Sequence, residues 1–200
     1  MRIGLFGFTL GIGFALVAGA VAANAGDFKY VGASKCRTCH KKELIGDQYT
    51  AWQNGVHAKA YETLKSDAAQ KIAAEKGISG PAQEAAECLS CHVTAYGKDA
   101  SAFASAPIEN EEGVSCESCH GPGSDYRKKK VMADHAASVA AGMWEPGKNA
   151  EVCTACHNAE SPTFKPFDHA ARVKEIAHPI PAEVKGRYIE AEKEARAKKK

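Results

Sequence analysis

Large apolar side chains are scarce once the first 25 residues are set aside. From residue 26 onward, Ile, Leu, Val and Phe together make up 23 of 175 residues, or about 13%. Below roughly 20% for these four types, a charged chain is normally disordered. Alanine supplies 31 of the same 175 residues, and segments of helical character recur between turns. Either the chain does not fold, or something other than its own side chains fills the core.

The chain also lacks an excess of one charge. Its 26 Lys and Arg residues against 24 Asp and Glu residues give a formal net charge of +2. Nucleic-acid-binding proteins gather basic residues on one face, often among aromatic side chains on which bases stack. The Lys and Arg residues here do not cluster around aromatics, and we therefore expect no nucleic-acid partner. The length of 200 residues allows one domain or two small ones.

The N-terminus holds the longest apolar run of the chain. One positive charge, Arg2, is followed by an uncharged stretch that ends in Ala23-Asn24-Ala25. A short basic start, an apolar stretch and small residues at the cleavage point are typical of a secretory signal peptide. Residues 3–21 are about long enough to span a membrane, so an uncleaved anchor is the alternative. Five glycines in that run and the Ala-x-Ala ending favour cleavage, and we expect a periplasmic mature protein.

The eight cysteines form four C-x-x-C pairs, and a histidine follows each pair at once. This is the attachment motif of c-type haem, in which two thiols bind the porphyrin and the histidine ligates the iron. The motifs are Cys36, Cys39 and His40; Cys88, Cys91 and His92; Cys116, Cys119 and His120; and Cys153, Cys156 and His157. We predict four covalently bound haem c groups, with the eight cysteines as attachment points and the four histidines as iron ligands.

Other uses of eight cysteines explain the pattern less well. Four-cysteine zinc sites join C-x-x-C pairs about 15–20 residues apart, whereas here the gaps are 48, 24 and 33 residues. A disulfide scaffold would make the regular spacing a coincidence. Four haems would also explain how a chain with so few large apolar side chains can fold, because their flat apolar faces replace the missing Leu and Phe in the core. We predict a mainly α, small multihaem cytochrome c, with short helices and loops packed around four covalent haems and little or no β structure.

Four further histidines equal the number of haems: His57, His135, His169 and His178. Only two methionines follow Met1, so methionine ligation of several haems is excluded by count. Histidine on both faces of a haem is the alternative, with a lower potential than a Met/His pair. His169 and His178 are nine residues apart, which is half a turn out of phase on one helix over residues 168–177. On a continuous helix they cannot serve the same haem face.

The chain resembles the tetrahaem cytochrome c-554 family, whose members accept electrons from hydroxylamine oxidoreductase in ammonia-oxidising bacteria. The resemblance covers about residues 33–180 and rests on more than the four motifs. The additional positions are Trp52 with His57-Ala58-Lys59-Ala60, Val93 with Gly97, Gly113-Val114, the block Cys116-Glu117-Ser118-Cys119-His120-Gly121-Pro122-Gly123, and Phe167-Asp168 with His178. The block and the position of His57 are the most specific of these.

The resemblance implies three six-coordinate haems. His135 would be the distal ligand of the first haem, opposite His40; His178 would serve the third, opposite His120; and His57 would cap the fourth, opposite His157. The second haem, held by His92, would have no distal protein ligand. The chain is shorter than the family pattern between the fourth motif and His178, and this compression would allow His169 to close the open site.

We expect an electron carrier rather than an enzyme. Its partners would be redox proteins that act as donor and acceptor, and the resemblance implies a multihaem oxidoreductase among them. Two other functions remain open. An open second haem would suit a small nitrogen-oxide or hydroxylamine reductase, with Tyr96 and Lys98 as candidate proton donors. A retained N-terminal segment would suit a membrane-anchored tetrahaem quinol dehydrogenase; a cleaved one leaves no stable membrane insertion.

The predicted organisation has three parts. Residues 1–25 form a cleaved signal peptide, residues 26–185 a tetrahaem cytochrome c domain, and residues 186–200 a charged C-terminal helix and tail. Within the domain, Ser66 or Asp67 is expected to cap a helix that runs to Lys76 and ends at Gly77. Residues 81–88 are expected to form a helix leading into the second motif, and Gly121-Pro122-Gly123 to break the chain after the third.

Overall fold

The computed structural model describes residues 27–198, and the predicted signal peptide, residues 1–25, lies outside them. Within the described range the chain is helical, and its only β feature is an isolated parallel bridge between Tyr30 and Phe103. The prediction of a mainly α chain with little or no β structure is confirmed. No helix between residues 27 and 198 is long and apolar enough to cross a membrane.

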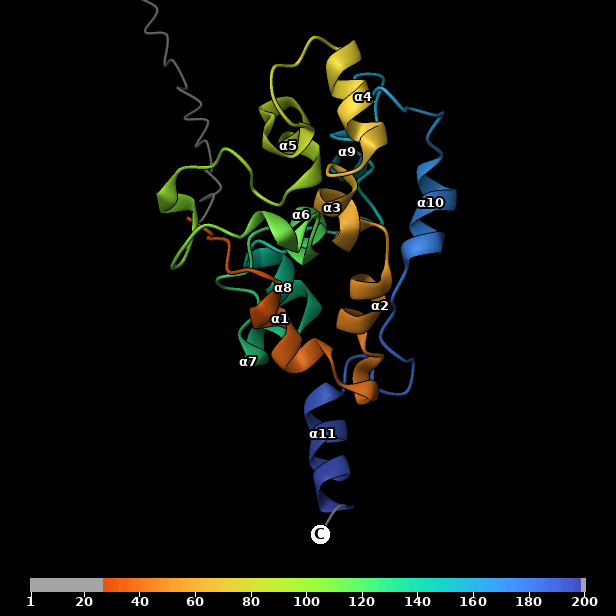
Figure 1. Cartoon of the computed structure of the whole chain (residues 1–200). Helices are drawn as coiled ribbons and strands as arrows, with labels where there is room; N and C mark the ends of the chain where they lie inside the picture. Colours follow the sequence, from red (N-terminus) through yellow and green to blue (C-terminus); the bar gives the residue numbers. More distant parts are fainter. Residues whose placement is uncertain (1–26, 199–200) are drawn as a thin grey trace, which may run out of the picture.

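The described chain consists of short α-helices, with 3-10 turns between those of its first half (Figure 1). In chain order the elements are α1 (Ala33–His40), η1 (Glu43–Ile45), α2 (Gln48–Asn54), η2 (His57–Lys59), α3 (Ala60–Thr63), α4 (Asp67–Glu75), η3 (Ala82–Glu84), α5 (Ala86–His92), η4 (Ala100–Ala102), η5 (Asn110–Glu112), α6 (Cys116–His120), α7 (Lys129–Met132), α8 (His135–Ala140), α9 (Glu151–Thr154), α10 (His169–Ile176) and α11 (Tyr188–Ala197). Such short helices are marginal alone in water, so tertiary contacts must hold them.

The helix boundaries follow local signals in some places and not in others. Ser66 caps α4, its hydroxyl accepting from the Ala69 amide at 3.3 Å, and Gly77 follows the helix with φ of 71°, as predicted. The prediction of a single helix over residues 81–88 is wrong. Ala85 has an extended backbone, with ψ of 127°, and separates the turn η3 from the helix α5. As a result α5 carries the whole second motif instead of leading into it.

The apolar core is small and lies in two separate places. One cluster surrounds the second motif and consists of Tyr61, Leu64, Ala73, Ala82, Leu89 and Val93. The other lies under the C-terminal helix and consists of Ile45, Val184 and Ala191. Neither cluster contains residues of α6 or α9, and the eight motif cysteines are half-buried. Side chains alone therefore leave the space around the motifs only partly enclosed, which fits large apolar groups bound there.

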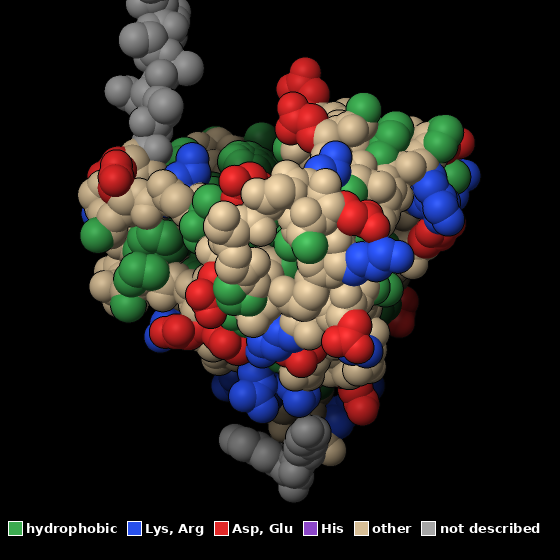
Figure 2. Space-filling view, turned by 45° about the horizontal axis from the view of Figure 1, so that its top comes forward, with side chains coloured by type: hydrophobic (Ala, Val, Ile, Leu, Met, Phe, Trp, Pro, Cys, Tyr) green, Lys and Arg blue, Asp and Glu red, His purple; other side chains and the backbone are tan. Residues whose placement is uncertain are grey.

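Helix α11 is docked against the rest of the chain. Ala191 packs with Ile45 of η1, and the nearly buried Glu192 accepts hydrogen bonds from Lys42, after α1, and Lys129, in α7. Figure 1 places α11 at the end of the molecule opposite α4, and Figure 2 shows Lys and Arg side chains gathered at that end. Residues 188–197 therefore belong structurally to the same body as the residues that carry the four motifs.

Candidate haem-binding sites

Three of the four C-x-x-C-H motifs are wholly helical. They lie in α1, α5 and α6, so their cysteines, three residues apart, share one helix face and the histidine follows. Each of these helices stops at the histidine; after α6 the stop is Gly121, whose φ of 77° favours glycine. The fourth motif differs, because α9 ends at Thr154 and Cys156 and His157 lie in the turn beyond it.

The four motifs lie next to one another in an order that differs from their order in the chain. The thiols of Cys36 and Cys116 interact, which raises the pKa of the first and lowers that of the second. Burial, followed by the neighbouring Cys153, raises the pKa of Cys119 to about 11. Helix α6 thus contacts both α1 and α9.

A third contact closes the series. Burial, with the neighbouring Cys91 thiol, raises the pKa of Cys156 to about 12. The spatial order of the motifs is therefore first, third, fourth, second. These thiols are the predicted attachment points of the porphyrin rings, so the order predicts a continuous row of haem sites.

Two histidine pairs face each other across a gap of matching width. The ring centres of His57 and His157 are 6.0 Å apart, at an interplanar angle of 83°. Those of His120 and His178 are 6.1 Å apart, at 75°. An imidazole nitrogen binds a transition metal at about 2.0–2.1 Å, so two rings on opposite sides of one ion have centres roughly 6 Å apart. Both pairs fit a shared iron, and they are two of the three pairs that the family resemblance implies.

Several histidines have one ring nitrogen engaged and the other left for a metal. Nδ1 of His92 lies 2.7 Å from the Ala60 carbonyl, and Nδ1 of His178 lies 2.9 Å from the Ile176 carbonyl. His40 approaches the Gln48 side-chain oxygen with Nδ1 at 3.3 Å. Donation from Nδ1 fixes the tautomer in which Nε2 carries the lone pair. Such partners orient an imidazole for ligation.

Partial desolvation also favours the neutral form of three histidines. Burial lowers the pKa of His120 to about 4, with smaller contributions from His178 and His40. Partial desolvation likewise lowers the pKa of the half-buried His57 and of the more exposed His157. A metal ligand must be the neutral imidazole, so these rings are ready to bind iron at neutral pH.

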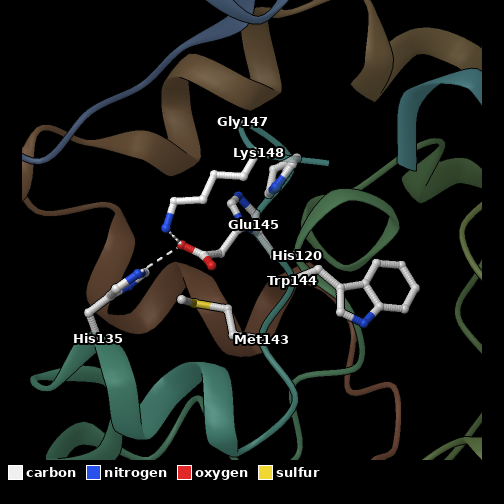
Figure 3. Close-up of a pocket in the computed structure, with 8 residues that line it drawn as sticks. His120, His135, Met143, Trp144, Glu145, Gly147 and Lys148 are labelled. Atoms are coloured by element: carbon white, nitrogen blue, oxygen red, sulfur yellow. Dashed lines mark hydrogen bonds and ion pairs between the residues drawn. The ribbon is translucent and has the colours of Figure 1, made fainter. Parts of the chain in front are cut away.

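His135 has a different environment. Its Nε2 lies 2.9 Å from Oε1 of Glu145, the oxygen that also accepts from Lys148 at 2.6 Å (Figure 3). These residues line a cavity of about 330 Å³ together with His120, Met143 and Trp144. The structure thus brings His135 to the cavity beside the third motif rather than into a facing pair with His40. Its ligation of the first haem stays a prediction.

His169 lies against the loop between α8 and α9. Its Nε2 is 2.8 Å from the Pro146 carbonyl, whereas the observed partner of His92 is Ala60 of α3. Helix α10 ends at Ile176 and Ala177 is extended, so His178 lies outside the helix and the predicted half-turn relation does not apply. Pro179 explains this end, because proline disfavours the helical conformation of the residue before it. Closure of the second haem by His169 stays a prediction.

Comparison with known proteins agrees with this geometry. The sequence profile described as "Cytochrome c554 and c-prime" matches residues 35–121. A curated protein, cytochrome c-554 of Nitrosomonas europaea, is 34% identical over 159 residues, which are 70% of this chain and 63% of that protein. The chain belongs to the cytochrome c-554 family.

A solved structure supports the same assignment. The reduced state of cytochrome c554 from Nitrosomonas europaea matches with a TM-score of 0.50 and 27% identity, covering 74% of this chain and 78% of that one. With four C-x-x-C-H motifs, this c-554-family protein is a multihaem c-type cytochrome. It spans 63% of the length of the curated relative.

Sequence reasoning gave Glu117 of this cytochrome no role. Its side chain is fully buried and accepts hydrogen bonds from the backbone amides of Val31 (3.0 Å), Gly32 (2.7 Å) and Gly123 (2.6 Å). Burial raises the pKa of Glu117, although these three donors oppose the shift. Glu117 stands at a variable position of the third motif, so only its place in the family-specific block marked it. It links the residues that precede α1 both to the start of α6 and to the loop that follows α6.

Other supporting contacts were also not predicted. Thr94, buried after the second motif, accepts from the Ser115 amide at 2.7 Å and donates to the Gly113 carbonyl at 2.9 Å. Phe167 stacks on His157, with ring centres 4.7 Å apart and an interplanar angle of 15°. The candidate proton donors Tyr96 and Lys98 are both exposed.

Proposed function

We propose that this c-554-family cytochrome is a periplasmic electron carrier that takes electrons from one redox protein and passes them to another. The observation that carries the proposal is the row of motifs, in which attachment cysteines of neighbouring motifs lie against each other. When bound, each haem accepts and releases one electron. The chain contributes the spacing of the sites, the axial histidines and the charge around them.

The arrangement of the side chains supports transfer along the row. Helices α1, α6 and α9 are in contact, which holds the first, third and fourth attachment points at fixed separations. The backbone bonds to Glu117 and Thr94 tie the loops between these helices to the helices themselves. Rigid spacing suits electron transfer, because the sites then need no rearrangement when the charge changes.

The axial ligands proposed for the third and fourth haems are the facing pairs, His120 with His178 and His57 with His157. His135 is proposed for the first haem, which requires its Nε2 to leave Glu145 when a haem is bound or its other ring nitrogen to serve. Imidazole on both sides gives a low potential relative to methionine ligation. Export through the predicted signal peptide supports the periplasmic location.

The test uses the mature holoprotein. We expect four haems per chain by mass, an N-terminus at Gly26, and low-spin ferric signals for the histidine-paired haems in electron paramagnetic resonance. Stopped-flow mixing with a reduced donor protein and an oxidised acceptor protein should show reduction followed by reoxidation. Fewer than four haems, or a reduced protein that passes no electron to any acceptor, would contradict the proposal.

A reductase at the second haem is the second candidate function. It is favoured by the position of His169, whose ring lies against Pro146 while His92 contacts α3. A ferric high-spin signal that disappears on adding nitric oxide, with turnover faster than free haem supports, would establish it. Turnover equal to that of free haem would reject it.

A further inference from the structure

Three basic segments that are far apart in the sequence meet at one end of the molecule. The carboxylate of Glu192 in α11 accepts from Lys42 at 2.7 Å, from Lys129, and from Arg196 at 3.3 Å. Lys42 follows α1 and Lys129 begins α7, so this one side chain gathers three elements. The amines of both lysines also lie over the ring of Tyr188, at 5.9 and 5.6 Å from its centre. We call this region the basic end.

The basic end is positive, whereas the rest of the described chain, within residues 27–198, is negative. Residues 41–43, 125–134 and 187–198 hold ten basic and six acidic residues. The remaining described residues hold thirteen basic and eighteen acidic ones. The separation gives the molecule a permanent electrical asymmetry, and Figure 2 shows Lys and Arg side chains crowded at this end.

Three of the six acidic residues of the basic end are held in ion pairs, and the other three, Glu43, Asp134 and Glu190, are exposed. Glu192 is only 8% exposed, so its negative charge is neutralised within the cluster by Lys42 and Lys129. Asp125 pairs with Lys128 at 2.5 Å and Glu194 pairs with Arg187 at 2.5 Å. The side chains of Lys41, Lys128, Lys130, Lys193 and Arg196 are exposed.

The basic end is also next to a predicted redox site. Lys41 and Lys42 follow His40 directly, and His40 closes the helix that carries the first motif. The first motif is one terminus of the row first, third, fourth, second. A protein that docks at the basic end therefore reaches the row at a terminal position.

We infer that the basic end is the docking surface for an acidic redox protein, which exchanges electrons with this cytochrome at the first haem. The inference rests on the proposed carrier function and adds the chemistry of the partner and the point of entry. In each encounter the reduced partner would give up one electron and the haem held by His40 would take it up, with no bond formed and no proton moved. Complementary charge raises the rate of encounter by about 10- to 1,000-fold at low salt.

The test compares two charge reversals in the holoprotein. Lys128→Glu with Lys130→Glu changes the basic end, and Lys71→Glu with Lys76→Glu makes the same change at α4, at the opposite end. The probe is a reduced plant-type [2Fe–2S] ferredoxin, an acidic one-electron donor, mixed by stopped flow over a range of ionic strength. We expect the first variant to lose about tenfold or more in second-order rate at low salt, with a flatter salt dependence. The second variant should stay within about twofold of the unaltered protein.

The other outcomes each contradict a specific claim. Equal losses in both variants, or no loss in either, would overturn the docking surface. So would loss of binding to phosphatidylserine vesicles by the first variant while its ferredoxin rate is unchanged, since that result assigns the basic end to a lipid surface. A protein that dithionite reduces but ferredoxin does not contradicts the docking surface alone. A reduced protein that yields no electron to any acceptor contradicts the carrier function.

Discussion

Two buried carboxylates, Glu117 and Glu192, hold distant parts of this cytochrome together by different chemistry. Glu117 is fully buried and bonds only to backbone amides, those of Val31, Gly32 and Gly123. Glu192 is 8% exposed and bonds to the cationic side chains of Lys42 and Lys129. Burial raises the pKa of Glu117, whereas Lys129 and Lys42 lower that of Glu192 to about 2.

The difference indicates what each carboxylate can do. Backbone amides have fixed positions and fixed protonation, so Glu117 defines the geometry between the first and third motif helices. Lysine amines exchange partners readily, so Glu192 holds α11 in place while leaving its cations available to a visiting acidic surface. The same residue type thus serves as an internal brace in one region and as an organiser of a surface in the other.

Removing the internal brace should have the largest effect. Glu117→Ala leaves three buried amide donors without an acceptor and creates a cavity, and we expect a loss of about 3–5 kcal/mol in the free energy of unfolding. Chemical denaturation of the holoprotein, followed by circular dichroism, measures it. Glu62→Ala, at an exposed side chain of α3, is the control and should change stability by less than about 0.5 kcal/mol. Equal losses in both variants would show that Glu117 is not a brace.

Removing the surface organiser should affect only the docking of α11. Glu192→Gln keeps the shape but removes the charge that gathers Lys42 and Lys129, so α11 should open more often. We expect amide hydrogen exchange in Tyr188–Ala197 to accelerate by about tenfold, with exchange in α6 unchanged. The matched control is Glu190→Gln on the exposed side of the same helix, which should leave exchange within about twofold. Faster exchange throughout the protein would contradict the separation of the two regions.

Acid should act on the two carboxylates in opposite directions. The pKa of Glu192 in the folded protein, about 2, is below its unfolded value near 4.3, so its stabilisation is present above pH 4.3 and is lost between pH 4.3 and 2. The pKa of Glu117 is raised, so its contribution does not fall as the pH drops and instead declines as the pH rises above about 4.3. Hydrogen exchange between pH 4.5 and 2.5, corrected for the intrinsic rate, should show α11 losing protection before Val31 and Gly32. The reverse order would contradict the assignment.

Salt should produce the smallest difference. Raising the ionic strength from 0.01 to 1 M shortens the Debye length from about 30 to about 3 Å, which weakens partly exposed ion pairs and leaves buried amide bonds nearly unchanged. Exchange in α11 should accelerate by a few-fold while the amides bonded to Glu117 stay the same. An equal response at both places would mean that the two carboxylates are equally accessible to solvent.

The class of the protein could be predicted from the sequence because the motif is local, and the attachment residues stay a prediction from the same motif. Four residues after each first cysteine suffice to recognise it, whatever the fold between motifs. The facing of His57 with His157 and of His120 with His178 came from family resemblance, since nothing in their local sequence identifies the partner. The brace at Glu117 was not predicted, because its acceptor role depends on amides more than 80 residues away.

Local signals also failed where backbone conformation changed within a residue or two. Residues 81–88 have a helical composition, yet Ala85 is extended, and the helix then starts late enough to include the motif. The C-terminal residues 186–200 have the charge pattern of a solvated tail. The docking of α11 within this segment depends on Lys42, 150 residues before Glu192, and on a core of three apolar residues that no periodicity of the sequence predicts.

The row of motifs has a consequence for how the chain is assembled. Cys36 and Cys116 are 80 residues apart, and Cys91 and Cys156 are 65 apart, so neighbours in the row are distant in synthesis. Contacts between residues so far apart in the sequence slow folding, because the entropy of closing a long loop is lost before the stabilising contacts form. If the chain is exported as proposed above, it can acquire its first haem long before the third motif arrives to shield it. We therefore expect an exposed, partly assembled cytochrome as an obligatory stage of its maturation.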